Sequence, residues 1–383
     1  MDIFSYTESF ATEVNRHTLL SHVRRAYLVR ALLLLPFLWL DLVIFLFYFF
    51  LYKPKKSHIF VTFKWPILFD LEKDVRPIFI GTVANIFTVI KYRGIYIPAS
   101  LIYVMLGILP WRCRFRSKIN YFLIRLSGWI VKFFAQDGSI LFHHSDALPF
   151  ARSLVMGAKL NAIKTVCIQH GAFHADSKSN ERDGLLSDLN VFRSDFDASL
   201  VSELTSDMNF LVLPDLFLLN IDKVEAGNKR VILLGEGYHI IDKAISKEYL
   251  SMLKEIESAL IIHGFKPVYR PHPSEKVFYR TFDFQNYDLE DLSTSLSKAD
   301  AVIGFTSTVL FEASGAGIFS FYLTVIGKSL GLEGRGNDYL KPFLIETLIN
   351  GKENENSMHL DSSVRIKLAI STLRNFLQKW NKI

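Results

Sequence analysis

Two series of short apolar segments, each alternating with longer amphipathic segments, constrain the fold of this chain more than any other feature. In the first series, apolar segments at 57–63, 139–146 and 164–171 have the length of buried strands. The segment at 147–161 lies between the last two and has the periodicity of a helix. A strand–helix–strand unit places its two strands parallel in one sheet. The pattern therefore predicts an α/β fold built on a parallel sheet.

A second series of the same kind follows a stretch of mixed proline, glycine and charged residues at 215–228. Strands are expected at 229–237, 266–273, 300–307 and 318–323, and helices at 246–264, 288–299 and 308–317. A chain of 383 residues is long enough for two hydrophobic cores of ordinary size. We therefore predict two Rossmann-like parallel-sheet domains, 57–220 and 221–383, that follow an apolar N-terminal helical region at 1–56.

The strongest apolar segment, at 31–52, has the length of a membrane-spanning helix. Basic residues flank it on both sides, namely Arg24, Arg25, Arg30, Lys53, Lys55 and Lys56. Two residues oppose a simple span, because Asp41 places a carboxylate near its middle and Pro36 kinks the helix. The segment is interpreted as inserted in a membrane or anchored shallowly on it, with a wholly buried helix as the alternative.

Two further apolar stretches, 95–111 and 119–134, carry aromatic and basic residues as well. The chain contains 33 phenylalanines, and its mean hydropathy is positive. These features favour a half-domain that lies against lipid, and ordinary core helices are the alternative.

Charge and cysteine content narrow the classes of partner. The formal charge of +6 is compatible with nucleic acid, anionic lipid or phosphorylated substrates. Nucleic-acid binding is not expected, because the basic residues near the N-terminus flank an apolar segment instead of alternating with aromatic residues. The two cysteines, Cys113 and Cys167, have neither disulfide nor zinc-ligand spacing. The acidic residues within 194–197 are typical of a polar loop or helix start, so no metal site is predicted.

A stiff polar segment ends the strand expected at 266–273. Its Arg270 and His272 alternate with two prolines, which restrict the backbone and hold both side chains at low entropic cost. Parallel α/β sheets bind ligands outside the carboxyl ends of their strands. A guanidinium and an imidazole held at such an end are predicted to bind an anion.

Hydroxyl residues follow the next expected strand. Thr306, Ser307 and Thr308 stand at the start of the helix expected at 308–317, where backbone N–H groups are not yet paired. These residues are expected to cradle a phosphate, or alternatively only to cap the helix. Glu312, one turn into the helix, is positioned to accept hydrogen bonds from a ribose. Because both polar segments fall at successive strand ends, they are expected to face one ligand.

The segment RPHP at 270–273, followed by ADAVIGFTSTVLFEASGAG at 299–317, resembles the donor-nucleotide half of bacterial GT-B glycosyltransferases. The patterns are most similar to those of CMP-sugar users, the sialyltransferases and Kdo transferases of surface-polysaccharide assembly, and of CDP-glycerol glycerophosphotransferases. The resemblance implies two domains facing a cleft and a metal-independent, inverting transfer. It implies that His272 contacts the donor phosphate, and that Ser307 and Thr308 bind phosphate or the leaving nucleotide.

Sugar transfer also needs a base that takes the proton of the acceptor hydroxyl. The segment at 163–174 is similar to the part of surface-polysaccharide transferases that ends an acceptor-domain strand at the interdomain cleft. Asp146, His170 and His174 are the candidates, because each lies at or just after a strand end expected in the first domain. Asp146 is alternatively a helix cap, and His170 stands before Gly171, which lets a ligand approach the backbone.

A glycine turn follows the strand expected at 229–237. Gly235 and Glu236 are predicted to touch the donor or acceptor at the floor of the cleft, unless they form a plain strand-to-helix turn. The dinucleotide fingerprint G-x-G-x-x-G is absent there, so NAD binding is not expected, and no other cofactor is predicted.

These features together predict a glycosyltransferase at the cytoplasmic face of the inner membrane. It would move a sugar from a nucleotide-activated donor, with CMP-sugar favoured, to a lipid-linked or cell-surface polysaccharide. The alternatives are a CDP-glycerol-type glycerophosphotransferase, a UDP-sugar 2-epimerase of the same fold and a non-catalytic membrane-associated assembly protein. The segment at 31–52 argues against an epimerase, since such enzymes are soluble.

Overall fold

The structure is a computed structural model. It describes residues 28–29, 31–51, 58–61, 68, 77–81, 91, 95–108, 116–135, 138–144, 149–169, 186–202, 209–217, 227–237, 243–275, 279–305, 307–323, 340–343 and 362–380.

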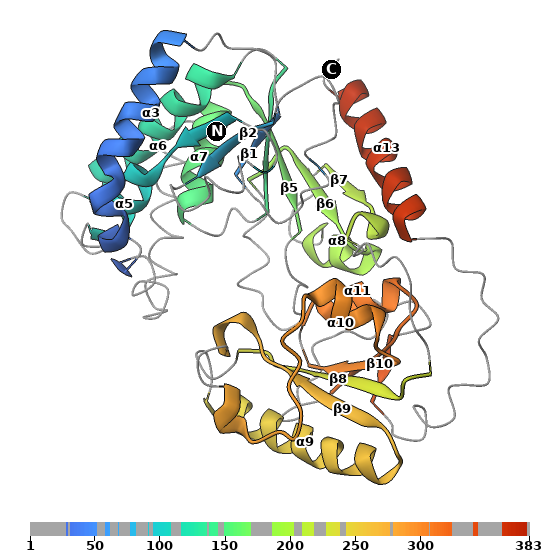
Figure 1. Cartoon of the computed structure of the whole chain (residues 1–383). Coiled ribbons are helices and arrows are strands. Elements are labelled where there is room, and N and C mark those ends of the chain that lie inside the picture. Colours follow the sequence, from blue (N-terminus) through green and yellow to red (C-terminus); the bar gives the residue numbers. More distant parts are fainter. Residues whose placement is uncertain are drawn as a thin grey trace.

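The first half of the chain forms a seven-stranded parallel sheet with the order β3-β2-β1-β4-β5-β6-β7 (Figure 1). The strands are β1 (His58–Phe60), β2 (Ile78–Gly81), β3 (Ile95–Pro98), β4 (Ile140–His143), β5 (Lys164–Ile168), β6 (Leu189–Phe192) and β7 (Phe210–Val212). Helices α5 (Ser100–Ile108), α6 (Arg116–Phe134) and α7 (Pro149–Leu160) cover one face of this sheet. Because helices cover the sheet, β1, β2 and β4 are buried along their whole length.

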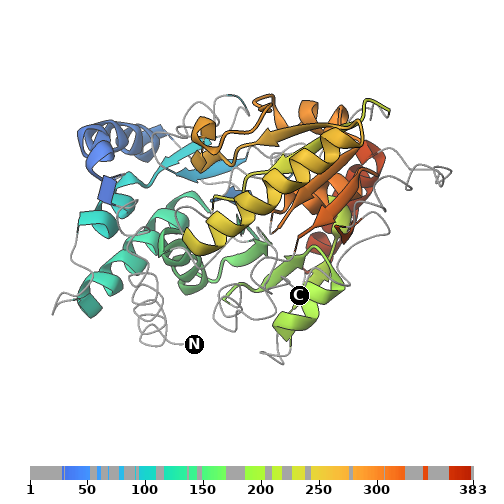
Figure 2. The same cartoon turned by 90° about the horizontal axis from the view of Figure 1, so that it is seen from below.

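The second half forms a five-stranded parallel sheet with the order β12-β11-β10-β8-β9. Its strands are β8 (Arg230–Leu234), β9 (Lys266–Arg270), β10 (Ala301–Gly304), β11 (Phe319–Tyr322) and β12 (Leu340–Pro342). Helix α9 (Lys243–Ile262) packs on one face, while α10 (Leu292–Ser297) and α11 (Val309–Gly315) pack on the other. Figure 2 shows α9 lying across this sheet when the molecule is seen from below. The prediction of two parallel α/β sheets is confirmed.

The C-terminal helix α13 (Ser362–Trp380) does not pack with the second sheet. Its buried residues, including Leu373, pack on the face of the first sheet opposite α5, α6 and α7, together with the short 3-10 helix η4 (Pro214–Phe217). Arg365 holds α13 in this position. Its guanidinium donates to Asp215 of η4 at 2.5 Å and to the carbonyl of Gly315 in α11 at 3.0 Å. The sequence prediction assigned all of 221–383 to the second domain, and the packing of α13 departs from it. The reason is that α13 buries its apolar stripe only against the first sheet.

The stretch 95–111, interpreted from its composition as lipid-facing or as a core helix, contains both a strand and a helix. Its first residues form β3, the edge strand of the first sheet, and its later residues form α5. The stretch 119–134 lies within α6, with one side buried in the core and residues such as Phe122 and Trp129 exposed.

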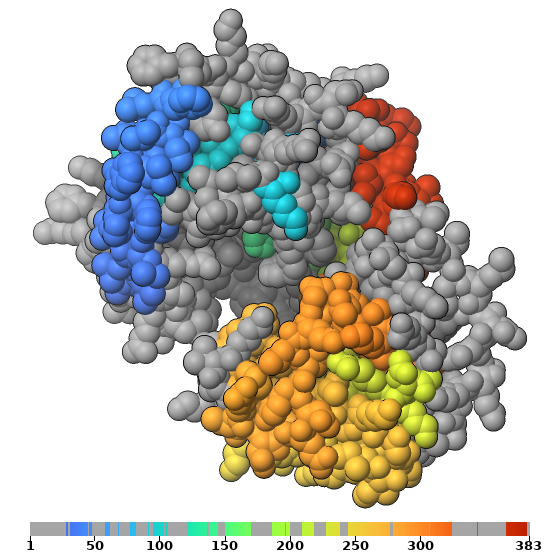
Figure 3. Space-filling model, in the orientation of Figure 1, coloured from blue at the N-terminus to red at the C-terminus, as the bar shows by residue number. Residues whose placement is uncertain are grey.

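The apolar segment at 31–52 forms a helical turn, the 3-10 helix η1 (Leu35–Phe37) at Pro36, and helix α3 (Leu38–Leu51). Helix α3 lies at the outer edge of the first domain against β3 and α5 (Figures 1 and 3). Among the described residues, no helix combines the length and the apolar character needed to cross a bilayer. The segment also does not form a wholly buried helix, because Trp39, Leu42 and Phe47 are exposed.

Asp41 explains how α3 is held on the domain. Its carboxylate is buried and accepts hydrogen bonds from the backbone N–H of Ser100 at 3.0 Å and from the Tyr96 hydroxyl at 3.5 Å. Burial raises the pKa of the Asp41 carboxyl, although the hydrogen bonds from Ser100 oppose this shift. The residue that argued against a membrane span is therefore the polar anchor that joins α3 to the sheet.

The raised pKa of Asp41 makes stability depend on pH with a definite sign. The folded state holds the Asp41 proton more tightly than the unfolded state, so this contribution is present at low pH and is lost as pH rises through the folded pKa. For Asp41→Asn, we expect the Tm of the parent minus the Tm of the variant to fall as pH rises, because only the parent loses the Asp41 proton. Thermal unfolding from acidic to neutral pH measures both values. Asp291→Asn is the control of opposite sign, because hydrogen bonding from Ser293 lowers the pKa of that carboxyl. Curves that stay parallel for Asp41→Asn contradict the assignment.

Candidate functional site

The candidate site lies at the carboxyl ends of three strands in the middle and at the edge of the second sheet. The loops that carry His272 and Ser307 follow β9 and β10. The sequence places these two segments at successive strand ends, but the two strands are not adjacent in the sheet, because β8 lies between β10 and β9. The strands are successive along the chain, but the crossover through α10 places β10 on the far side of β8. The loop after β8 therefore becomes the centre of the site.

Glu275 joins the loop after β9 to the loop after β8. It belongs to the 3-10 helix η6 (Pro273–Glu275) and is 3% exposed. Its carboxylate accepts hydrogen bonds from the backbone N–H groups of His272 at 2.8 Å and Gly237 at 3.0 Å. It also accepts one from the Tyr269 hydroxyl at 2.9 Å. These bonds hold the His-Pro segment against the glycine turn.

Tyr269 supports Glu275 from below. Its ring is fully buried and stacks on Phe284 with a centroid distance of 4.2 Å. Burial raises the pKa of the Tyr269 hydroxyl, and the negative charge of Glu275 raises it further. The phenol therefore stays protonated and remains a hydrogen-bond donor to the carboxylate.

The glycines at 235 and 237 are required by close approach. A Cβ on Gly235 would lie 2.6 Å from the backbone nitrogen of His272 and 2.7 Å from the Tyr269 hydroxyl. Gly237 has a φ of +69°, and a Cβ there would lie 2.8 Å from Nδ1 of His272. A side chain at either position would separate the two loops. The turn is therefore packed directly against the loop after β9, and its predicted contact with a donor or acceptor stays a prediction.

Glu236, between these glycines, reaches the opposite neighbour. One carboxylate oxygen, Oε1, accepts hydrogen bonds from the backbone N–H groups of Phe305 at 2.7 Å and Ser307 at 3.1 Å. The sequence interpretation assigned backbone donors of this segment to a bound phosphate. In the structure the protein's own carboxylate holds two of them. The turn after β8 thus binds the loop after β9 through Gly237 and the loop after β10 through Glu236.

His272 is the exposed polar side chain of this cluster. Its Nδ1 accepts a hydrogen bond from the backbone N–H of Ser274 at 3.2 Å and lies 2.7 Å from the Ser274 hydroxyl oxygen. In the neutral ring, an accepting Nδ1 leaves the proton on Nε2. Ser274 therefore sets the orientation of the His272 ring, with Nδ1 as the acceptor and the proton on Nε2.

Ser307 and Thr308 begin α11. The Ser307 hydroxyl accepts a hydrogen bond from the backbone N–H of Val309 at 3.3 Å, which is local capping. Thr308 is the N-cap residue but makes no side-chain cap bond. Its hydroxyl is half-buried at the helix start, next to the loop that Glu236 holds. Glu312 is buried in the first turn of α11.

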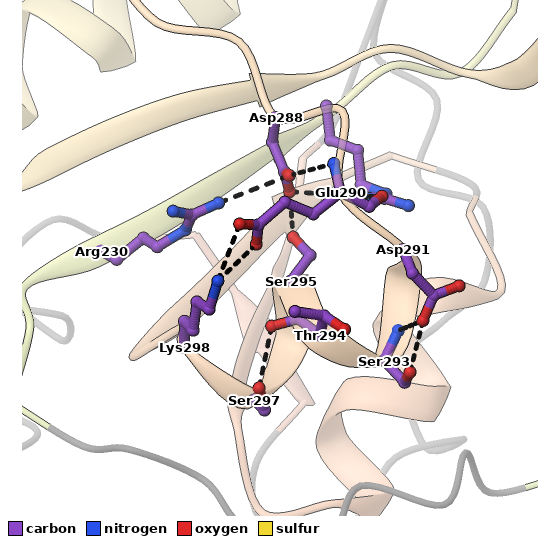
Figure 4. A network of polar contacts seen from close by, with 10 residues as sticks. Arg230, Asp288, Glu290, Asp291, Ser293, Thr294, Ser295, Ser297 and Lys298 are labelled. Atoms are coloured by element: carbon purple, nitrogen blue, oxygen red, sulfur yellow. Dashed lines mark hydrogen bonds and ion pairs between the residues drawn. The ribbon is translucent and has the colours of Figure 1, made fainter.

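Arg270, predicted to bind the same anion as His272, is engaged elsewhere. Its guanidinium donates to Asp288 at 3.2 Å and to the carbonyl of Glu290 at 2.9 Å. Asp288 has a side chain that is 0% exposed and also pairs with Arg230 at 3.4 Å and accepts from the Ser295 hydroxyl (Figure 4). The alternation of side chains along β9 turns Arg270 toward α10, whereas Tyr269 faces α9. The structure thus gives Arg270 a role in holding the second domain together.

Four of the predicted site residues lie outside the described residues, namely Asp146, His170, His174 and Thr306. Their predicted roles stay predictions. Close to them in the chain, the imidazole Nε2 of His143 lies 2.6 Å from the Ser187 hydroxyl, and Gln169 accepts a hydrogen bond from the backbone of Arg193 at 2.8 Å.

Sequence reasoning missed Glu275 and Arg193. Glu275 stands three residues after His272, a spacing that favours a hydrogen bond from the backbone N–H of His272 to the Glu275 carboxylate. Arg193 follows β6, and its guanidinium lies 5.0 Å from the ring of Phe217 in the first domain and 5.1 Å from that of Phe311 in α11. Nothing local marks Arg193, because its two aromatic partners come from different domains.

Comparisons with known proteins address the fold. The sequence matches no protein-family model and no curated protein. Among solved structures, it is similar to the UDP-GlcNAc 2-epimerase of Neisseria meningitidis bound to UDP-GlcNAc, with a TM-score of 0.58 and 13% identity over 84% of this chain and 99% of that chain. It is also similar to the UDP-GlcNAc 2-epimerase of Methanocaldococcus jannaschii in complex with UDP-GlcNAc and UDP. That match has a TM-score of 0.53 and 13% identity over 83% of this chain and all of that chain.

A third similarity is to the wall teichoic acid polymerase TagF, with a TM-score of 0.44 and 9% identity over 86% of this chain and 90% of that chain. At these identities the likeness concerns the fold alone. The two parallel sheets and the two epimerase matches show that the chain has an α/β fold of the GT-B type.

Proposed function

We propose that this chain is a metal-independent GT-B glycosyltransferase that uses a nucleotide-activated sugar, with a CMP-sugar favoured, and a lipid-linked or cell-surface polysaccharide acceptor. The observation that carries the proposal is the joining of three loops at the strand ends of the second sheet. Glu275 and Glu236 link the loops after β9 and β10 to the glycine turn after β8. This edge of a parallel sheet is where such folds bind their ligands.

In this proposal His272 and the start of α11 bind the phosphate of the donor, of which a CMP-sugar has one. The Nε2–H of His272 donates to a phosphate oxygen, and the Thr308 hydroxyl donates from the opposite side of the glycine turn. A hydrogen bond donated by the protein to the phosphate of the leaving nucleotide stabilises the negative charge that develops as the bond between the sugar and that phosphate breaks. The absence of side chains at Gly235 and Gly237 lets the donor approach the backbone. The acceptor hydroxyl then loses its proton to a base of the first domain, with His170, Asp146 and His174 as the candidates.

The apolar outer face of the first domain supports a lipid-linked acceptor. Helix α3 exposes Trp39, Leu42 and Phe47 on the same domain that the resemblance assigns to the acceptor. An enzyme placed at the cytoplasmic face of the inner membrane would meet both its nucleotide donor and a membrane-bound acceptor. This location is part of the proposal.

A UDP-sugar 2-epimerase is the second candidate, because the fold matches above include two such enzymes. Transfer is preferred, since an epimerase acts on a nucleotide sugar alone and has no use for an exposed apolar face on the other domain. A CDP-glycerol-type glycerophosphotransferase would instead transfer a glycerol-phosphate group, breaking the pyrophosphate of its donor and releasing CMP. A non-catalytic assembly protein would not need an exposed His272 whose ring is held in place by Ser274.

Thermal unfolding with CMP, CDP, UDP and GDP tests the proposal. A ligand present at 100 times its Kd stabilises the folded state by about 2.7 kcal/mol, so the nucleotide that fits raises Tm by several degrees. We expect CMP to give the largest shift, and CDP the largest if the donor is CDP-glycerol. No shift with any of the four nucleotides contradicts the proposal.

Product analysis then separates the two enzyme classes. The selected nucleotide sugar is incubated with the full-length protein, with and without a membrane extract that contains the acceptor. A transferase releases the free nucleotide only when the acceptor is present, whereas an epimerase interconverts the sugar without it. Interconversion in the absence of acceptor would replace the proposed function by the second candidate.

A further inference from the structure

Helix α3 turns its polar and apolar residues the opposite way from a surface helix in a soluble domain. Such helices turn apolar residues inward and charged residues outward. In α3 the only charged residue, Asp41, points inward and is 7% exposed, whereas Trp39 and Leu42 are 64% and 59% exposed. The hydrogen bonds from Ser100 and Tyr96 to Asp41 fix this orientation. The helix is therefore attached through its polar residue and presents its apolar side to the surroundings.

The exposed apolar surface continues from α3 onto α5 and α6. Of the 20 large apolar side chains that are exposed among the described residues, 15 lie at positions 28–47 or on these two helices. Leu101 of α5 and Phe122 and Trp129 of α6 belong to this set. Figures 1 and 2 place the three helices side by side on the same outer side of the first domain. We call this surface, formed by residues 28–47, α5 and α6, the apolar face. A contiguous face of this size marks an interaction site.

The exposed charged residues described on the apolar face are basic. On the described parts of these segments the only acidic residue is the buried Asp41, while Arg125 and Lys132 of α6 are exposed. The sequence adds basic residues on both sides of the apolar segment, at 24–30 and 53–56. Large aliphatic and aromatic side chains bordered by Lys and Arg are typical of segments that lie in the interface of an anionic bilayer.

A groove of about 460 Å³ opens within the apolar face. Leu38 and Leu46 of α3 form one wall, Leu101 of α5 forms another, and Trp129 and Ile130 of α6 complete it. The lining is almost entirely apolar, so it accommodates a hydrocarbon chain and not a hydrated ligand. A groove of this kind on a flat apolar surface gives a lipid chain from the bilayer a place to enter.

We infer that the apolar face docks in the interface of an anionic lipid bilayer, with a lipid hydrocarbon chain in the groove between α3, α5 and α6. One side of helix α3 packs against β3 and α5 of the domain, so only its other side is open to lipid. The helix therefore lies in the interface. The exposed Trp39 and Trp129 enter the headgroup region, and Arg125 and Lys132 meet anionic headgroups. This inference deepens the membrane location in the proposed function but does not depend on sugar transfer.

Vesicle flotation with the full-length protein, purified in mild detergent and then diluted, tests the inference. The vesicles are phosphatidylcholine alone or phosphatidylcholine with phosphatidylglycerol. We expect the parent to float with the mixed vesicles. The double variant Trp39→Glu/Val43→Glu is expected to bind these vesicles at least tenfold more weakly than the parent. The matched control is Ile262→Glu/Leu368→Glu, which adds the same charge at exposed apolar positions off the apolar face and is expected to float like the parent. Circular dichroism melting of all variants confirms that they are folded.

The variant Arg125→Gln/Lys132→Gln separates the electrostatic part. It is expected to lose most of the preference for phosphatidylglycerol while keeping weak binding to neutral vesicles. A parent that does not float with either vesicle overturns the inference. So does a parent that forms a dimer in size-exclusion chromatography with light scattering, binds no vesicle and becomes monomeric in Trp39→Glu/Val43→Glu, because a second copy would then occupy the face. Vesicle binding together with failed sugar transfer would count against the proposed function alone.

Discussion

Replacing His272 with alanine is expected to lower the rate of sugar transfer by about 100-fold to 1,000-fold, the usual cost of removing one donor that stabilises developing negative charge. The fold should survive, because the imidazole is exposed and the bonds to Glu275 come from the backbone N–H of His272 and not from its ring. The measurement is the rate of nucleotide release from the donor that thermal unfolding selects. Tm is recorded in parallel.

His263→Ala is the matched control, because this histidine is exposed at the end of α9, on the opposite side of the second sheet from α11. It is expected to leave both the rate and Tm unchanged. If His272→Ala retains turnover within a fewfold of the parent, the assignment of the donor phosphate to His272 is wrong, whatever happens to nucleotide binding.

The second large effect is on stability. Removing the Asp288 carboxylate with Asp288→Ala is expected to lower the free energy of unfolding by about 3 kcal/mol. The variant leaves the partly buried guanidinium groups of Arg230 and Arg270 without their shared carboxylate, and it leaves the Ser295 hydroxyl without its acceptor. Figure 4 shows Asp288 joined to Arg230 and to Ser295 of α10. Chemical denaturation of the purified full-length protein measures the change.

Asp291→Ala provides a graded comparison in the same segment. Asp291 is the N-cap of α10 and accepts from the backbone N–H of Ser293, so its loss is expected to cost about 1 kcal/mol. Equal effects of the two substitutions would show that the buried ion pairs contribute no more than a helix cap.

The second sheet shows what local sequence patterns can predict. Strands such as β8 and β10 and the helices between them were predicted because hydrophobic periodicity and turn residues act over a few residues. The sequence also singled out His272 as a candidate site residue, since the prolines that restrict its backbone are its neighbours in sequence. For Gly235 and Glu236 the sequence left two interpretations open, contact with a ligand or a plain strand-to-helix turn, and the structure adds the hydrogen bonds that join this turn to the loops on both sides.

Other features of the site depended on sheet order. The sequence implied that β9 and β10 both contribute, but it did not show that β8 separates them. The role of Glu236 as the acceptor for the backbone of Phe305 and Ser307 follows from that order alone. Arg270 looked like an anion ligand because only its position at a strand end was visible. Its partner Asp288 reaches it through the paired segment beside β9.

By itself, the sequence determined that the chain forms two parallel α/β units and carries an apolar segment near its N-terminus, because both follow from the periodicity of neighbouring residues. Only the tertiary structure decided which way that segment faces and where the last helix packs. Asp41 turns inward because Ser100, 59 positions away, supplies a backbone N–H. Helix α13 returns to the first sheet because Arg365 meets Asp215, 150 positions earlier. Contacts over such distances are set by how whole layers pack, which no local pattern records.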